Sequence, residues 1–376
     1  MIKINEKGGI LYPSVSIIVP TYEEALNIPI LIERVDKVRQ KYNLKLEMLI
    51  MDDNSQDGTQ KLFEMFDEDW VHLYVRKTER GLSLAVSEGL DKANHEMLVV
   101  MDADLSHPPE MIPIFLEELQ NGFDFVIGSR YVVGGSTSDD WGFIRWLNSR
   151  VATLLALPFT SVKDPMSGFF ALTKDTFKKA KYLDPVGYKI GLEIIVKCNC
   201  EKIKEIPIHF QNRKYGESKL TLKEQLSYLK HIKRLLNYKY GNWSYLAQFL
   251  TVGGLGVLVN LAVLMVLLSV GLHVKVAVGF AIFVSLVFNF VLNRYITFSY
   301  AKTEPVFKQF LGFTGACTVG AVVNYFTTIG VLRAFPVLIP QVAALIGIVA
   351  GSMLNFLFNR FGVFKKVHYR KYPSAY

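Results

Sequence analysis

Two patterns of apolar and polar residues divide the chain. In residues 14–240, short apolar runs alternate with longer stretches that have helical periodicity. The runs expected to be strands are Val15–Val19, Met48–Met51, Val71–Val75, Met97–Met101 and residues 124–127, and Glu23–Gln40 is expected to be a helix. Strands that alternate with helices predict a mostly parallel, doubly wound α/β sheet.

The second pattern consists of four almost charge-free stretches, at 245–271, 276–293, 309–332 and 334–359. Each reaches or nearly reaches the ~20 residues that a helix needs to cross a bilayer. We therefore expect an all-α four-helix transmembrane domain. Basic residues gather before the first stretch, between the second and third, and after the fourth, so the positive-inside rule predicts cytoplasmic termini and a cytoplasmic 1–240 segment.

Composition supports this division. The 376 residues include 42 Lys+Arg and 34 Asp+Glu, which gives a net charge of +8, and 51% are hydrophobic. A mean hydropathy of +0.24 excludes a single soluble globule as well as a disordered or fibrous chain. Three cysteines cannot form a disulfide framework, which fits a reducing compartment, and Cys198 and Cys200 have no second Cys/His pair to complete a metal site. The excess positive charge lies beside the spans, which disfavours a nucleic-acid binder.

The membrane half repeats itself. Asn289–Tyr295 reappears as Asn355–Phe361, and Gln248–Leu250 reappears as Gln309–Leu311. Each repeat is one helical hairpin, so the two repeats should run parallel. The paired asparagines should face other helices, either as structural contacts or in handling lipid.

These patterns predict a domain order with two amphipathic segments between the halves. Trp141–Phe159 and Ser218–Tyr240 mix apolar and basic residues, as helices in the membrane interface do, although core-facing helices are the alternative. The expected divisions are a cytoplasmic catalytic domain at 1–217 with an interfacial helix at 141–159, a juxtamembrane helix at 218–240, transmembrane helices at 241–364, and a basic cytoplasmic tail at 365–376.

Polar segments follow three of the expected strands, where ligands bind in such sheets. They are Pro20–Asn27, Asp52–Thr59 and Asp102–Glu110, and none contains a dinucleotide or P-loop motif. Asp102 and Asp104 should point the same way, because side chains alternate along an extended chain. An acidic edge can hold an anionic ligand through a divalent cation, so Mg²⁺ or Mn²⁺ is expected.

The three segments resemble those of family 2 glycosyltransferases of the GT-A fold. Together with Gly128–Tyr131, Ser167–Phe169 and Gly216–Leu220 they are similar to the dolichyl-phosphate mannose synthases, and residues 245–364 resemble the GtrA-like domain fused to some of these. The resemblance implies an α/β GT-A catalytic domain with a Rossmann-like, mostly parallel sheet.

The resemblance also implies site roles. Asp104 would be the main metal ligand, Asp102 would lie near the ribose and the metal, and Ser106 would complete the metal shell. Asp53 would recognise the base of the nucleotide. The other residues expected to contact the nucleotide sugar are Pro20, Tyr22, Glu24, Ala103, Arg213 and Lys219.

Basic residues on the lipid side should bind the acceptor. Arg145 and Ser149 are i,i+4 neighbours on one helix face and could bind a phosphate at membrane level. Arg130 and Arg213 are further candidates, because guanidinium forks suit phosphate. Glu193 and Asp164 are possible contacts of sugar hydroxyls, although Asp164 could equally cap the following segment.

The resulting hypothesis is metal-dependent, inverting transfer of mannose from GDP-mannose to a polyprenyl (dolichyl) phosphate at the lipid bilayer. Arg130, Arg213 and Asp104 would carry the reaction. No general base is required, because a phosphate monoester is largely dianionic at neutral pH. A glucosyltransferase that uses UDP-glucose, or a flippase of lipid-linked sugar with a regulatory soluble domain, is the alternative. The absence of a Gln-x-x-Arg-Trp motif disfavours a processive polysaccharide synthase.

Overall fold

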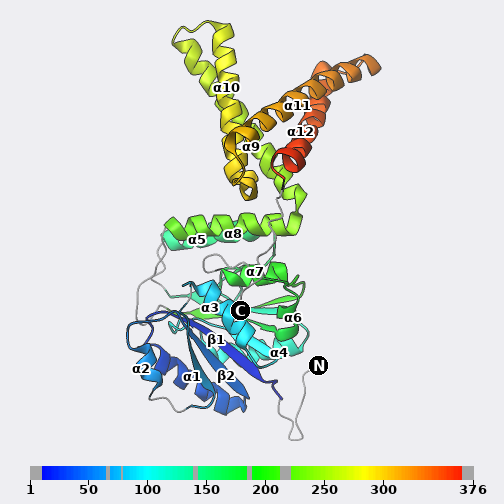
Figure 1. The fold of residues 1–376 in the computed structure, drawn as a ribbon. Helices are drawn as coiled ribbons and strands as arrows, with labels where there is room; N and C mark the ends of the chain where they lie inside the picture. The colour runs from blue at the N-terminus through cyan, green and yellow to red at the C-terminus, as the bar shows by residue number, and fades with distance from the viewer. Residues whose placement is uncertain are drawn as a thin grey trace. The chain divides into compact units, whose positions relative to one another are not determined.

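The computed structural model describes residues 11–64, 68–77, 79–138, 143–183, 189–211 and 222–365, and among these the side chains of 143–147 and 222–223 are left out. The chain divides into two compact units, Met1–Lys239 and Tyr240–Tyr376 (Figure 1). Each unit is described by itself.

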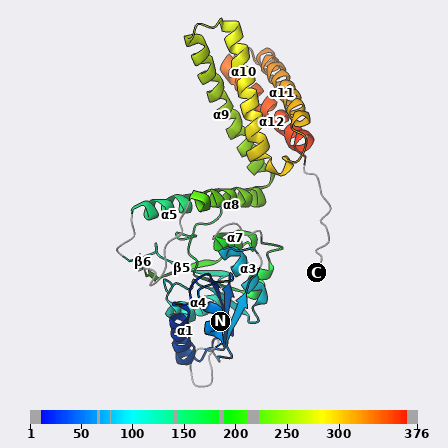
Figure 2. The same ribbon diagram turned by 60° about the vertical axis from the view of Figure 1, so that its left-hand side comes forward.

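A seven-stranded sheet forms the centre of the described part of the first unit (Figures 1 and 2). Its strand order is β3-β2-β1-β4-β7-β5-β8, and β7 alone among these strands runs antiparallel to its neighbours. The strands are β1 Val15–Thr21, β2 Leu46–Asp52, β3 Val71–Val75, β4 Met97–Val100, β5 Phe125–Ser129, β7 Phe170–Thr173 and β8 Ile203–Pro207. The expected mostly parallel α/β sheet is confirmed.

Helices cover both faces of this sheet. Ile17 and Val19 of β1 belong to one core, with α1 (Ile28–Tyr42) and α4 (Ile112–Gln120). Ile18 points the other way, into a core with α3 (Leu82–Lys92) and α7 (Ile190–Lys197). Burial on both faces explains why the strands read as continuous apolar runs. Short elements complete the unit: α2 Thr59–Phe63, the 3-10 turn η1 Pro109–Met111, α6 Lys174–Lys178, and the strand pair β6 Ser136–Thr137 and β9 His209–Phe210.

The first helix begins later than its periodicity predicts, at Ile28 rather than Glu23. Glu23 has a left-handed backbone (φ 60°), which cannot continue a right-handed helix. The Asn27 amide N–H then donates to the Glu24 carbonyl at 2.9 Å, which closes a turn before the helix. The segment just after β1 is therefore a loop at the sheet edge.

Two amphipathic helices pack on each other beside α7. They are α5 (Phe143–Ala156) and α8 (Leu222–Tyr240), and the Tyr228 hydroxyl of α8 donates to the Ala152 carbonyl at 2.8 Å. One apolar face of the pair is buried with Leu192 of α7. A second apolar face is exposed, with Leu154 64% and Leu226 55% accessible. The helices therefore combine core packing with an apolar face that the described chain does not cover.

The second unit contains four helices that, among the described residues, are long and apolar enough to cross a membrane. They are α9 Asn242–Ser269, α10 Val274–Leu292 continued by the π-helix η2 Asn293–Thr297, α11 Val306–Ala334, and α12 Pro340–Leu357 continued by the π-helix η4 Phe358–Val363. The 3-10 turn η3 Ser299–Ala301 connects the halves. The chain is a membrane protein. The fourth helix begins at Pro340 and not at residue 334, because proline is favoured in the first helical turn.

The repeat seen in the sequence is visible in the packing. Asn289 of α10 lies against Gly256 of α9, where an added Cβ would be 2.2 Å from the Asn289 Oδ1. Asn355 of α12 lies against Gly320 of α11 in the same way, with 3.0 Å to its Cβ. The expected contact with another helix is confirmed for Asn289 and Asn355, whereas Asn293 and Asn359 donate from Nδ2 to the Asn289 and Asn355 carbonyls one turn earlier.

Each repeat ends in a π-helix that carries a buried arginine. Arg294 donates to the Lys302 and Glu304 carbonyls at 2.6 and 2.9 Å. Arg360 donates to the Tyr300 hydroxyl at 2.6 Å and lies 4.4 Å from the Tyr245 ring centroid. These two arginines therefore stabilise the helix ends from inside the unit.

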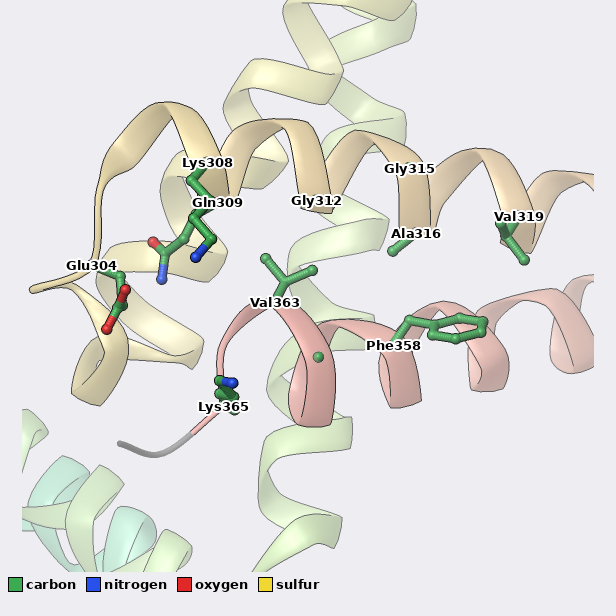
Figure 3. A pocket seen from close by; sticks show the side chains of 11 residues that line it. Glu304, Lys308, Gln309, Gly312, Gly315, Ala316, Val319, Phe358, Val363 and Lys365 are labelled. Carbon is green, nitrogen blue, oxygen red and sulfur yellow. The ribbon is translucent and has the colours of Figure 1, made fainter. Parts of the chain in front are cut away.

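At the same end of the unit, a cavity of about 570 Å³ lies between α11 and η4 (Figure 3). Glycines and small apolar side chains line its length, and charged side chains stand at one end.

Candidate active site

Three loops meet at the carboxyl edge of β2, β1 and β4, which are neighbours in the sheet. The Asp53 amide N–H donates to the Thr21 carbonyl at 2.9 Å, which joins the first two loops. Each loop has one non-glycine residue with a left-handed backbone: Glu23 (φ 60°), Asn54 (φ 58°) and Leu105 (φ 65°). Such conformations cost roughly 1–2 kcal/mol each and gather at functional sites.

The acidic turn after β4 places its two aspartates differently. Asp104 is buried, and its Oδ1 accepts hydrogen bonds from the Ser106 amide at 3.1 Å and the Ser106 hydroxyl at 2.5 Å. Asp102 keeps 29% of its side chain accessible, and its amide N–H donates to His107 Nδ1 at 3.1 Å. His107 in turn stacks on Phe169 with ring centroids 5.2 Å apart. These hydrogen bonds and the ring contact hold the turn in place, and Asp102 is its more accessible carboxylate.

The chain approaches Asp102 closely at Gly168. A Cβ on Gly168 would lie 3.1 and 3.2 Å from the two carboxylate oxygens of Asp102. Glycine thus keeps room beside this carboxylate. Within the described residues no group of three or more His, Cys, Asp or Glu side chains forms a self-sufficient metal site. Two carboxylates are enough for Mg²⁺ or Mn²⁺ when substrate phosphates supply further oxygens, so the residues present fit such a cation.

The residues expected to line the nucleotide pocket stand at the same edge. Pro20 is buried at the end of β1. The Tyr22 hydroxyl accepts from Arg80 Nη1 at 2.9 Å, and the Arg80 guanidinium lies 4.8 Å from the Tyr22 ring centroid. Glu24 Oε2 accepts from Asn27 Nδ2 at 2.5 Å. Ala103 is only 3% exposed and belongs to the core, so its backbone is the part that can face a ligand.

Asp53 has a partner that the sequence did not reveal. Its carboxylate forms an ion pair with Arg76, which is 6% exposed, and also accepts from the Gly81 amide at 2.8 Å. Arg76 Nε donates to Glu88 at 2.9 Å. Arg76 is the first residue after β3, which runs parallel to β2. Its position directly after a parallel strand, at the carboxyl edge of the sheet, is the sequence signal that could have identified it.

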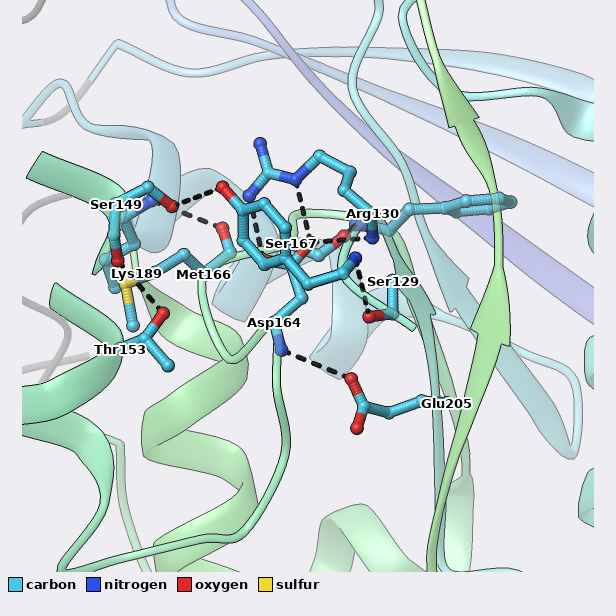
Figure 4. Close-up of polar contacts among 11 residues, drawn as sticks. Ser129, Arg130, Ser149, Thr153, Asp164, Met166, Ser167, Lys189 and Glu205 are labelled. Atoms are coloured by element: carbon cyan, nitrogen blue, oxygen red, sulfur yellow. Dashed lines mark hydrogen bonds and ion pairs between the residues drawn. The ribbon is translucent and has the colours of Figure 1, made fainter. Parts of the chain in front are cut away.

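Arg130 is fixed by a buried carboxylate (Figure 4). Its Nε and Nη2 donate to Asp164 Oδ2 and Oδ1 at 2.7 and 2.8 Å, and its amide N–H donates to Oδ2 at 3.0 Å. Burial would lower the pKa of Arg130, but the hydrogen bonds and charge of Asp164 raise it on balance. Asp164 is completely buried and both of its carboxylate oxygens accept from Arg130, while its suggested contact with a sugar hydroxyl stays a prediction. Its role is to hold Arg130.

The other acceptor candidates are only partly described. Ser149 of α5 accepts a hydrogen bond from the Tyr131 hydroxyl at 2.7 Å, which links α5 to the residue after Arg130 (Figure 4). Arg145 is also on α5, but its side chain lies outside the described residues, as do Arg213 and Lys219. Their predicted roles stay predictions.

Lys189 is a further candidate for binding an anionic ligand, and no sequence motif indicated it. It is half-buried, lines the same small cavity as Asp102, and donates from Nζ to the Met166 carbonyl at 3.2 Å. Burial, followed by the nearby charge of Arg130, lowers the pKa of Lys189 to about 7, although Asp164 and Asp102 oppose the shift. A cation of this kind beside an acidic turn suits an anionic ligand.

Glu193 is held by a neighbouring lysine, and its suggested contact with a sugar hydroxyl stays a prediction. It is 1% exposed, and its Oε1 accepts from Lys197 Nζ at 2.6 Å on the next turn of α7. A carboxylate this deeply buried needs such a partner. It therefore belongs to the packing between α7 and its neighbours.

Each of the two units contains a segment that matches the model of a known protein family. Residues 16–180 match the model of glycosyl transferase family 2, and residues 248–364 match the GtrA/DPMS transmembrane domain. A dolichol-phosphate mannosyltransferase from Pyrococcus furiosus is 39% identical over 351 residues, which cover 92% of this chain and 98% of that protein. One from Saccharomyces cerevisiae is 39% identical over 60% of this chain and 88% of its own length.

A solved structure of glucosyl-3-phosphoglycerate synthase from Mycobacterium tuberculosis, in complex with Mn²⁺, uridine diphosphate and glucosyl-3-phosphoglycerate, is similar to part of this chain. It is 15% identical with a TM-score of 0.46, and the match covers 60% of this chain and 80% of that one.

Proposed function

Because the chain belongs to the dolichol-phosphate mannosyltransferase family, we propose that it transfers mannose from GDP-mannose to a membrane polyprenyl phosphate. The chain is a glycosyltransferase by this membership. The choice of GDP-mannose as donor is the proposal. Transfer to a phosphate acceptor is best supported by the small cavity that Asp102 and Lys189 line together, beside the buried Arg130–Asp164 pair.

A divalent cation is the proposed cofactor. Asp104 and Asp102 would hold Mn²⁺ or Mg²⁺, with Ser106 fixing the Asp104 carboxylate. When bound, the cation would neutralise the negative charge that develops on the departing diphosphate. Pro20, Tyr22, Glu24 and the backbone of Ala103 would surround the nucleotide.

Asp53 was expected to recognise the base of the nucleotide, and its contacts in the structure suggest an indirect form of that role. Since its carboxylate already binds Arg76 and the Gly81 amide, we propose that it shapes the base-binding end by fixing these groups. A direct contact of Asp53 with the base would add to this role.

In the reaction, an oxygen of the lipid phosphate attacks C1 of mannose while the bond from C1 to the diphosphate oxygen breaks and GDP leaves. The attacking phosphate is already ionised near neutral pH, so no side chain has to remove a proton. Arg130 would position this phosphate, with Arg145, Ser149 and Arg213 as further contacts. Lys189 would stabilise anionic oxygens between donor and acceptor, and Lys219 would contact the nucleotide sugar. Direct displacement inverts C1, so an α-linked donor gives a β-linked product.

The membrane arrangement proposed here places residues 1–240 and both termini in the cytoplasm. Basic residues beside the ends of the spans support this side. The exposed apolar face of α5 and α8 supports a position in the lipid interface, where a lipid phosphate is presented.

A donor–acceptor assay tests the function. Purified full-length protein in detergent is incubated with a polyprenyl phosphate and either labelled GDP-mannose or labelled UDP-glucose, with and without Mn²⁺. We expect labelled lipid from GDP-mannose only, and only with the metal. Label from UDP-glucose instead would identify a glucosyltransferase, and no label from either donor would support a flippase with a regulatory soluble domain.

A further inference from the structure

The cavity between α11 and η4 has the features of a binding site that the transfer reaction does not use (Figure 3). Its volume of about 570 Å³ lies within the range of small-molecule sites, which is about 300–1,000 Å³. It is built wholly from the second unit. Its two walls are the first half of α11 and the last turns of the fourth span.

The cavity is apolar along its length and charged at one end. Gly312, Gly315, Ala316, Val319 and Phe358 line the apolar part. Val319 lies ten residues beyond Gln309 on the same helix, so this wall extends for about 15 Å. At the charged end, Lys308 lies in the first turn of α11, Lys365 lies two residues beyond Val363 at the end of η4, and Glu304 also lines the cavity. An elongated apolar groove with a basic mouth matches a lipid chain attached to an anionic headgroup.

One buried polar atom lines this mouth without a partner. Gln309 is 3% exposed and donates from Nε2 to the Ala301 carbonyl at 2.9 Å. Its Oε1 has no hydrogen-bond partner within the described part of the chain. A buried acceptor of this kind is costly unless something donates to it. A hydroxyl on a lipid headgroup is a group that can donate here.

We propose that this cavity binds one anionic phospholipid of the bilayer, with a hydrocarbon chain along α11 and the phosphodiester between Lys308 and Lys365. The charges at the mouth favour a phosphodiester over a phosphate monoester. Two lysines and one glutamate sum to +1, which balances the single negative charge of a phosphodiester, whereas a monoester carries about −1.5 to −2 at neutral pH. The site is thus distinct from the acceptor site beside Arg130.

Native mass spectrometry of the full-length protein tests this site. The protein is titrated in detergent with dioleoyl phosphatidylglycerol, whose glycerol carries hydroxyl donors, or with zwitterionic dioleoyl phosphatidylcholine. We expect one tightly bound phosphatidylglycerol per chain. K308A/K365A should reduce the preference for phosphatidylglycerol about 30-fold, because each lysine near an anionic headgroup contributes a factor of about five. K302A/K275A removes the same charge from positions that do not line the cavity and should keep the preference.

A second pair of variants tests the apolar groove. A Cβ on Gly315 would meet nothing within 4 Å, so we expect the leucine of G315L to extend into the groove. Gly330 is equally open on the same helix but lies outside the cavity, so G330L is the matched control. We expect G315L to weaken binding of both lipids and G330L to leave it unchanged.

Three results would overturn the proposal. Wild-type protein could bind both lipids equally, or K308A/K365A could behave like its charge-matched control. Farnesyl phosphate, a short isoprenoid monoester, could displace phosphatidylglycerol at a lower concentration than unlabelled phosphatidylglycerol does, which would reassign the cavity to the acceptor class.

Discussion

Replacing Asp164 by asparagine should test whether the buried carboxylate positions Arg130. The change removes the negative charge from a pair in which Asp164 is fully buried and the Arg130 side chain is 9% exposed. Removing one partner of a buried pair costs about 3–5 kcal/mol, and the remaining exposure of Arg130 favours the lower end, about 3 kcal/mol. For a unit of this size we expect the midpoint of thermal unfolding to fall by about 6–12 °C.

Thermal unfolding of the full-length protein in detergent, followed by tryptophan fluorescence, measures this shift. The matched control is Asp175→Asn, because Asp175 is 89% exposed and its pair with Lys178 spans 3.9 Å. That control should change stability by less than about 0.5 kcal/mol. Steady-state kinetics add a second readout: Asp164→Asn should raise the KM for lipid phosphate more than the KM for nucleotide sugar. Equal midpoints for the two variants, or a rise in the donor KM alone, would refute the reasoning.

Three further predictions follow from the same unit. Asp104→Asn should reduce transfer by on the order of 100-fold or more while the unfolding midpoint stays near the wild-type value, and a Mn²⁺ titration of the activity checks this. In metal-free protein, the pKa of Lys189 is lowered to about 7 in the folded state from its ordinary value of 10.5. Between these two pH values the unfolded state binds more protons than the folded state, so the free energy of unfolding should rise with pH from 7 to 9. Lys189→Met should flatten this rise, as measured by unfolding midpoints across that range. Gly89→Ala places a Cβ 2.5 Å from Ile18 Cγ2 and should destabilise by about 1–3 kcal/mol in denaturant titrations, with unchanged activity per folded molecule.

The elements that the sequence predicts well are those whose pattern is local. The first five strands and the four spans follow from apolar runs that need no knowledge of their partners. Two strands of the sheet were missed, Phe170–Thr173 and Ile203–Pro207. The first is a four-residue strand that runs antiparallel between β4 and β5, so only its neighbours distinguish it from a loop. The second strand lies at an edge of the sheet and is about half polar, so it does not form an apolar run.

The same distinction holds for the candidate site. Asp104 and Ser106 are two residues apart, and the motif that contains them revealed both. Arg130 and Asp164 are 34 residues apart, so the sequence showed two separate candidates and not one ion pair. Lys189 has no motif, and its importance comes from a cavity that exists only after folding. Long-range electrostatic partners are therefore what sequence patterns alone could not supply.

In the proposed membrane arrangement, α5 connects the transfer reaction to the bilayer. A lipid phosphate stays at the headgroup level because its chain remains in hydrocarbon, so the protein must bring its phosphate-binding groups to that level. α5 exposes Leu154 and also carries Ser149, which the Tyr131 hydroxyl ties to the residue beside Arg130. If the exposed face of α5 enters the interface, the hydrogen bond from Tyr131 to Ser149 fixes the depth of Arg130 at the same time. Acceptor recognition and membrane contact would then depend on one helix, and the spans would not need to contribute a side chain to the reaction.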